Sequence, residues 1–152
     1  MSVLESLAKE HSLMGGLVDR LEEGLREGPE RAPGEVRQAL LVLFRALEKH
    51  EEIEDLVFGH PAYASKGEAR RILAEVERQH DRIAQILGEI DDLLRLGDRC
   101  SFGTLADLVL DLAGKLRRHF ASEEARLWPH YRRTRRPPAD RALDRRAMEQ
   151  VL

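Results

Sequence analysis

The chain has 152 residues, of which 42% are apolar, 35% are charged and 5% are aromatic, and its formal net charge is -3. This length fits one domain that buries a core, and the small net charge gives no reason to expect binding to nucleic acid or to an anionic membrane. No apolar run reaches the roughly 18 residues of a membrane span, and the single Cys100 cannot form an internal disulfide. We therefore expect a soluble, cytoplasmic protein.

Clusters of glycine and proline divide the sequence into four long segments and a tail. Capping-box patterns mark three of the segment starts: Ser2 with Glu5, Ser65 with Glu68 and, more weakly, Thr104 with Asp107. The predicted helices span residues 3–27, 35–58, 66–96 and 105–133. The sequence predicts an all-α, up-down-up-down four-helix bundle over residues 1–135.

The first two predicted helices carry apolar stripes that polar residues interrupt. In the first helix, Leu7 and Met14 belong to one stripe with steps of three and four residues only if His11, which lies between them, is counted as a member. In the second helix, the stripe that includes Leu47 continues through His50 and Glu54. Such a seam packs helices side by side in a bundle, so these polar side chains should face the core.

The third and fourth predicted helices repeat this pattern with a constant spacing. The pairs His11 and His80, His50 and His119, and Glu54 and Glu123 are each 69 residues apart. A single offset therefore superimposes three unusual core positions without a gap. The bundle is predicted to be a duplicated helical hairpin.

The segment that follows is rich in arginine. Residues 132–152 hold seven arginines and three acidic residues, and Leu143, Ala147 and Val151 form a short apolar stripe. We expect residues 136–152 to form a short, docked amphipathic helix.

A histidine and a glutamate four residues apart project from one face of a helix, so both can bind the same ion. An ionised glutamate buried without a partner costs several kcal/mol. No arginine or lysine occupies the seam positions, whereas four histidines do. Imidazole and carboxylate together suit Fe, Mn or Zn, which predicts a metal site in the core.

Glu51 is a further candidate ligand, because its counterpart in the second half is Phe120 and an aromatic side chain there suggests a position that faces inward. The predicted metal ligands are His11, His50, Glu51, Glu54, His80, His119 and Glu123. If Glu54 and Glu123 bridge two ions, an added oxo or hydroxo bridge leaves one coordination position for a small ligand. O2, peroxide and NO are the ligands we expect there.

The ordered pattern resembles the haemerythrin-like family, also called the HHE cation-binding domain. Its motif, a histidine followed by His-x-x-x-Glu on the next helix, occurs twice here, at His11 with His50 to Glu54 and at His80 with His119 to Glu123. The resemblance implies a non-haem di-iron centre that carries or senses O2 or iron, or handles NO or peroxide.

One departure from the family pattern concerns the third helix. Oxygen-carrying members place a second histidine four residues after the first, where this chain has Ala84, and Gly15 stands at the pseudo-symmetric place. Simple O2 carriage is therefore less expected, while Glu51 resembles an extra carboxylate of sensor-type members.

Three functions remain open from the sequence. The first is a di-iron protein that binds or senses O2, iron or a related ligand, and the second is a di-iron enzyme with peroxidase, oxidase or NO-handling activity. The third is a metal-free helical scaffold, which should keep its melting temperature after chelation. We expect His60, Tyr63, Trp128, His130 and Tyr131 to pack at the end of the bundle.

Overall fold

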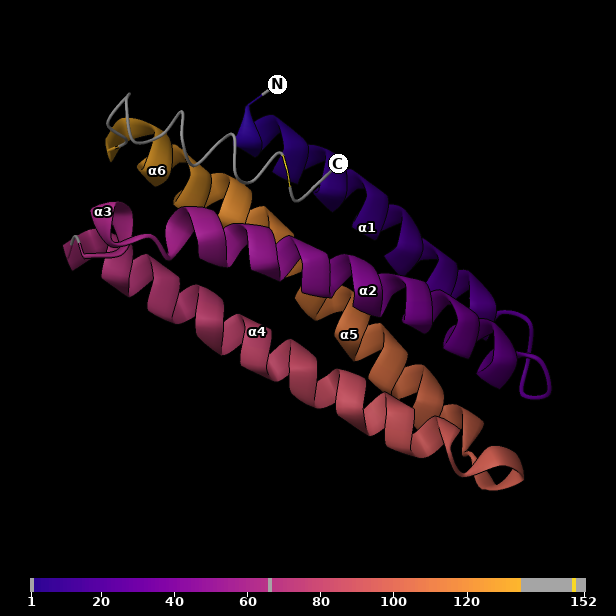
Figure 1. The fold of residues 1–152 in the computed structure, drawn as a ribbon. Coiled ribbons are helices and arrows are strands. Elements are labelled where there is room, and N and C mark those ends of the chain that lie inside the picture. The colour runs from indigo at the N-terminus through magenta and orange to yellow at the C-terminus, as the bar shows by residue number, and fades with distance from the viewer. Residues whose placement is uncertain (1, 66, 135–148, 150–152) are drawn as a thin grey trace.

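The computed structural model describes residues 2–65, 67–134 and 149. Its helical elements are α1 (Val3–Leu25), α2 (Ala32–Phe58), α3 (Pro61–Ala64), α4 (Gly67–Leu94), the 3-10 turn η1 (Gly97–Arg99), α5 (Phe102–Ser122), the π-helical turn η2 (Glu123–Leu127) and α6 (Trp128–Thr134) (Figure 1). This confirms the predicted all-α bundle. Apart from residue 149, the predicted helix over residues 136–152 lies outside the described residues.

The four long helices run antiparallel to their neighbours along the chain (Figure 1). The turn after α1 and the turn η1 lie at one end of the bundle, and α3 and α6 lie at the other. Gly28 and Gly97 supply the two positive φ angles at the first end, 87° and 58°. Glycine adopts this conformation without a steric cost, so both hairpins close tightly. Within the described residues, no helix combines the length and apolar content that a membrane span would need.

The predicted helix starts were right in one case and shifted in the others. The capping box of α1 forms, because the Ser2 hydroxyl accepts from the Glu5 amide at 3.2 Å and the Glu5 carboxylate accepts from the Ser2 amide at 2.7 Å. The Ser65 hydroxyl donates to the Pro61 carbonyl at 2.6 Å, and its predicted capping box with Glu68 stays a prediction because residue 66 lies outside the described residues. Helix α5 is capped by Ser101, which precedes the predicted cap.

Helix α2 begins at Ala32, before the expected start, because proline is tolerated in the first turn of a helix. The fourth predicted helix is interrupted by η2, in which the Trp128 amide donates to the Glu123 carbonyl. Pro129 follows directly and cannot complete an ordinary α-helical turn, which gives a physical reason for the wider one.

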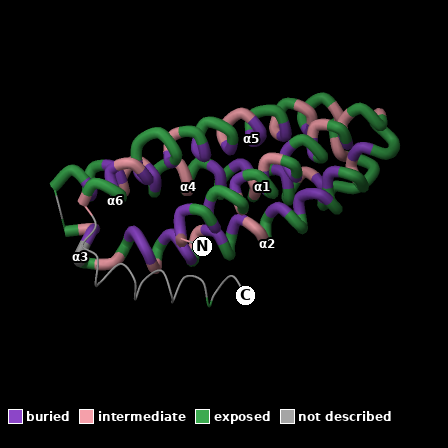
Figure 2. Tube along the Cα trace, turned by 90° about the horizontal axis from the view of Figure 1, so that it is seen from above, coloured by how far each residue is buried: buried purple, intermediate pink, exposed green. Residues whose placement is uncertain are grey.

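Buried residues recur along all four long helices (Figure 2), and the buried apolar ones form two clusters. The larger cluster takes α1 from Met14 onward and α2 up to Leu47, together with α4 and α5. The smaller cluster takes the start of α1 up to Leu7, the end of α2 from Ile53, and the aromatic residues of α3 and α6. Between them, α1, α2 and the segment of α5 and η2 contribute buried histidine or glutamate, and α4 contributes the part-buried His80. The apolar layers therefore enclose one polar layer.

Candidate metal centre

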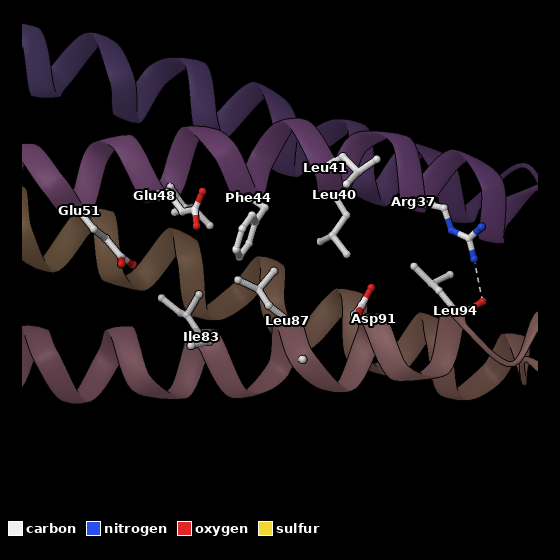
Figure 3. Close-up of a pocket in the computed structure, with 13 residues that line it drawn as sticks. Arg37, Leu40, Leu41, Phe44, Glu48, Glu51, Ile83, Leu87, Asp91 and Leu94 are labelled. Atoms are coloured by element: carbon white, nitrogen blue, oxygen red, sulfur yellow. Dashed lines mark hydrogen bonds between the residues drawn. The ribbon is translucent and has the colours of Figure 1, made fainter. Parts of the chain in front are cut away.

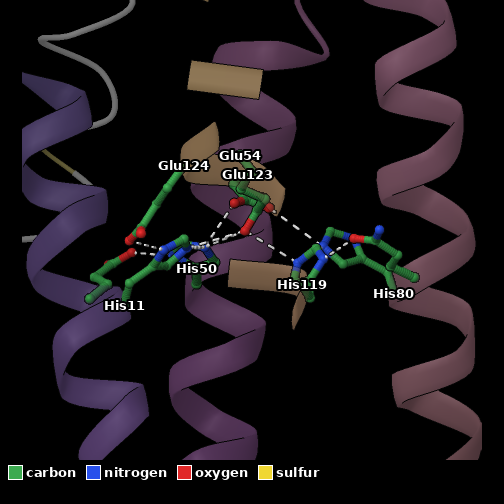
Figure 4. A network of polar contacts seen from close by, with 9 residues as sticks. His11, His50, Glu54, His80, His119, Glu123 and Glu124 are labelled. Carbon is green, nitrogen blue, oxygen red and sulfur yellow. Dashed lines mark hydrogen bonds and ion pairs between the residues drawn. The ribbon is translucent and has the colours of Figure 1, made fainter. Parts of the chain in front are cut away.

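Six of the seven predicted ligands meet in this polar layer (Figure 4). They are His11 from α1, His50 and Glu54 from α2, His80 from α4, His119 from α5 and Glu123 at the start of η2. Five of the six are buried, and the side chain of His80 is 17% exposed. The seam positions thus converge as the periodicity of the helices predicted.

The six residues form two groups of four that share both carboxylates. One group contains His11 and His50, the other contains His80 and His119, and Glu54 and Glu123 belong to both. Within each group, one ligand atom from every residue lies within 4.8 Å of the others. Either group could hold a metal ion, with two imidazoles of its own and the two carboxylates that both groups share.

The imidazole nitrogens are spaced as ligands of a common ion would be. The Nε2 atoms of His11 and His50 are 3.1 Å apart, and those of His80 and His119 are 3.0 Å apart. Two nitrogens bound at right angles, each about 2.1 Å from one metal ion, would be about 3.0 Å apart. The spacing of both pairs therefore fits a metal ion.

Three carboxylate oxygens in this layer are buried and have no hydrogen-bond partner among the described residues: both oxygens of Glu54 and Oε2 of Glu123. His50 Nε2 lies 2.8 Å from Glu54 Oε1, although the contact lacks the geometry of a hydrogen bond. Such oxygens are costly in a core unless a cation meets them. The side chains present therefore fit a bound metal pair.

Three of the histidines are held from outside the polar layer. The Nδ1 atom lies 2.7 Å from a Glu10 oxygen in His50, 3.1 Å from a Glu124 oxygen in His11 and 2.6 Å from the Gln79 oxygen in His119. A hydrogen bond from Nδ1–H fixes the ring so that Nε2 faces the core, where it can bind a metal ion once it carries no proton.

The sequence interpretation missed these three supporting residues. A signal was present for two of them, because Glu10 and Gln79 each directly precede a seam histidine and are again 69 residues apart. Glu124 offered no such signal, since its contact with His11 depends on how α1 packs beside η2.

Charges in the metal-free layer are unequally distributed. Burial lowers the pKa of His50, but the attraction of Glu54 and the contact with Glu10 outweigh burial and raise this pKa to about 12. Burial lowers the pKa of His119 to about 4, because neighbouring imidazoles add to the effect and Glu123 offsets only part of it. A proton on His50 thus stands in for a cation beside Glu54, and a metal ion must displace it.

The family model described as Hemerythrin HHE cation binding domain matches residues 2–131 and residues 71–150. The chain belongs to this family. No curated protein and no solved structure matches it. The family assignment and the paired histidine and glutamate groups agree that this HHE domain is a metal-binding protein.

Glu51 is the predicted ligand that the HHE domain does not bring into either group. It follows His50 directly, and one residue corresponds to a turn of about 100° around a helix. Its half-buried side chain lies toward α4, beside the groove between α2 and α4 (Figure 3). Burial raises the pKa of the Glu51 carboxyl, with His80 opposing this shift. Metal binding by Glu51 therefore stays a prediction.

The end of the bundle holds further histidine and aromatic side chains of the HHE domain, as expected. His130 is buried, with its Nδ1 atom 2.8 Å from the Tyr63 hydroxyl and its Nε2 atom 3.3 Å from Glu68. Trp128 also contacts the polar layer, because its ring stacks on the imidazole ring of His11 with centroids 4.7 Å apart. An aromatic face thus shields one side of the polar layer from water.

Proposed function

We propose that this HHE domain binds two iron ions in its polar layer and uses the pair to bind or sense a small ligand such as O2, NO or peroxide. The observation that carries the proposal is the sharing of Glu54 and Glu123 by two histidine pairs, with three buried carboxylate oxygens left without a donor. Imidazole and carboxylate ligands suit iron, and they also accommodate Mn or Zn. We place the protein in the cytoplasm as part of the same proposal.

In this proposal each residue has a defined task. His11 and His50 hold one ion, His80 and His119 hold the other, and the two glutamates neutralise both. Glu51 is proposed only as a further ligand, since the two groups are complete without it. When bound, the iron pair would supply an open coordination position and reversible electron transfer.

A second candidate function is catalytic, with peroxidase, oxidase or NO-handling activity. Ala84 favours it, because this small, exposed residue leaves the face between α2 and α4 open one helical turn beyond His80. Fast consumption of peroxide or NO by the iron-loaded protein would identify the enzyme. A reversible spectral change without turnover would identify the sensor or carrier.

Metal analysis combined with an absorption spectrum in air tests the proposal. We expect two iron ions per chain and the near-ultraviolet absorption of a bridged diferric centre, which zinc would not give. Glu54→Gln and Glu123→Gln should each lose both ions, because each carboxylate belongs to both groups. Glu77→Gln is the matched control, since Glu77 is exposed on α4. Wild-type protein with no metal, or Glu54→Gln protein that keeps both ions, would contradict the proposal.

A further inference from the structure

A groove with a volume of about 390 Å³ runs between α2 and α4 (Figure 3). Its walls are mainly apolar and include Leu40, Phe44 and Leu47 from α2, and Ile83 and Leu87 from α4. Phe44 remains 45% exposed, which is unusual for a large aromatic side chain in a protein with five others in its core clusters. Small-molecule sites commonly have this size and apolar character.

The charged groups are arranged unequally along the groove. Glu48 and Glu51 lie at the end nearer the polar layer, one turn apart on the same face of α2. Neither forms a hydrogen bond or ion pair with another residue in the described part of the chain. At the far end, Arg37 donates to the Leu94 carbonyl at 2.8 Å, and the Asp91 carboxylate accepts from Arg95 at 2.9 Å. The groove therefore has two negative charges without an ion-pair partner at its inner end, and the positive charge of Arg37 at its far end.

The shape of the groove favours a small molecule over a helix from a partner. The contact between Arg37 and Leu94 bridges the two helices and closes the far end. From Arg37 to Glu51, α2 rises about 21 Å at 1.5 Å per residue. This length suits an extended apolar chain, whereas a partner helix that continued along the groove would meet the contact between Arg37 and Leu94 at the far end.

We propose that this groove binds an amphiphilic organic cation, an alkylamine in the simplest case. Its ammonium group would pair with Glu48 and Glu51, and its apolar body would lie along Phe44 and Leu87. The same carboxylates repel a fatty acid and offer a neutral alcohol only ordinary hydrogen bonds. Because His50 directly precedes Glu51, a bound amine would also perturb a neighbouring metal pair, a consequence that rests on the proposed function.

Calorimetric titration of the full chain with decylamine, decanol and decanoate below their micelle concentrations tests the charge preference. We expect decylamine to bind about tenfold more tightly than decanol, since hydrogen bonds to charged groups are stronger by more than 1 kcal/mol. Decanoate should bind least. Glu51→Gln should reduce the amine preference by about the same factor, and Glu52→Gln, at an exposed neighbouring position, should not.

A second variant tests the location without altering charge. A Cβ added at Gly88 meets no atom within 4 Å, so Gly88→Leu should fold and fill the groove. Gly16→Leu is its matched control, because Gly16 has equal space on the exposed side of α1. Both changes raise helix propensity, so only binding should separate them.

Several outcomes would overturn the amine site. They are equal affinity for decanoate and decylamine, unchanged amine binding by Gly88→Leu, and absence of amine binding by the full chain. A dimer in sedimentation that Gly88→Leu abolishes would show that a second copy covers the groove instead. Loss of metal from Glu51→Gln protein would assign Glu51 to the metal centre. A chain without any metal that still binds decylamine would refute only the proposed function.

Discussion

Removal of the metal pair should destabilise the bundle strongly, because the polar layer interrupts its apolar core. In the metal-free protein, three buried carboxylate oxygens of Glu54 and Glu123 have no hydrogen-bond partner, and one of them, Glu54 Oε1, lies 2.8 Å from the protonated His50 ring. A bound cation pair satisfies all three. A ligand that binds only the folded state stabilises it by linkage, so chelation must lower the free energy of unfolding.

The size of the effect follows from these oxygens. A buried polar group without a partner costs about 1 to 3 kcal/mol. Glu54 Oε1 has protonated His50 beside it, so the other two oxygens together cost about 2 to 6 kcal/mol. For a chain of this size, 1 kcal/mol changes the melting temperature by about 2 to 4 °C. The lower limit of about 2 kcal/mol therefore predicts that metal removal lowers the melting temperature by about 4 to 8 °C.

Thermal unfolding followed by circular dichroism measures this shift before and after dialysis against a chelator, with metal content determined on the same samples. Glu123→Gln, which should bind no metal, is the control and should melt at the same temperature with and without the chelator. A wild-type protein that loses its metal but keeps its melting temperature would refute the reasoning. The polar layer would then be a metal-independent part of the scaffold.

Three further predictions test individual contacts. Glu10→Ala removes the partner of His50 Nδ1 and should weaken metal affinity about 10- to 100-fold in a competition assay with a chelator, whereas exposed Glu52→Ala should not. In the metal-free protein, the pKa of His119 is lowered to about 4. Between about pH 6.5 and pH 4, this histidine therefore binds a proton in the unfolded chain but not in the folded chain. Stability in urea should therefore fall as the pH falls through this window, and His119→Gln should flatten the slope. Ser101→Ala should cost about 0.5 to 2 kcal/mol of stability because Ser101 caps α5, and Thr104→Ala should cost less.

The positions of the six converging residues were predictable from the sequence because they obey a local rule. A side chain at a seam position of a helix must face the neighbouring helices, and the offset of 69 residues identified these positions twice. His11, for example, is a seam residue by spacing alone, and its burial follows. Periodicity within each helix therefore sufficed to find the polar layer.

Features that depend on contacts between helices could not be found this way. Glu51 was assigned to the interior from its counterpart Phe120, yet Phe120 is buried and Glu51 only half-buried. The two halves differ because α2 packs closely on α1 but leaves a groove toward α4. The periodicity of a helix does not predict how far it lies from its neighbours. The turn η2 was missed for a related reason, since Pro129 indicates a disturbance but not how the chain resolves it.

The duplication also left the two metal groups electrostatically unequal. The histidines of the first group are held by carboxylates, Glu10 at His50 and Glu124 at His11, whereas His119 of the second group is held by the neutral amide of Gln79. A carboxylate partner makes an imidazole a stronger ligand than an amide does. Glu10 adds to the larger effect of Glu54 in raising the pKa of His50, whereas burial lowers the pKa of His119.

Metal ions should therefore bind in two unequal steps, because the first group has carboxylate-supported imidazoles but must also release the proton on His50. Calorimetric titration of the metal-free protein with Fe2+ under anaerobic conditions should resolve the two steps, and Gln79→Glu should tighten the step that involves His119. Gln85→Glu adds the same charge at an exposed position of α4 and should leave both steps unchanged. Equal steps in the wild-type protein would contradict the difference between the two groups. An equal response to both substitutions would mean that long-range charge, rather than the hydrogen bond to His119, sets the metal affinity.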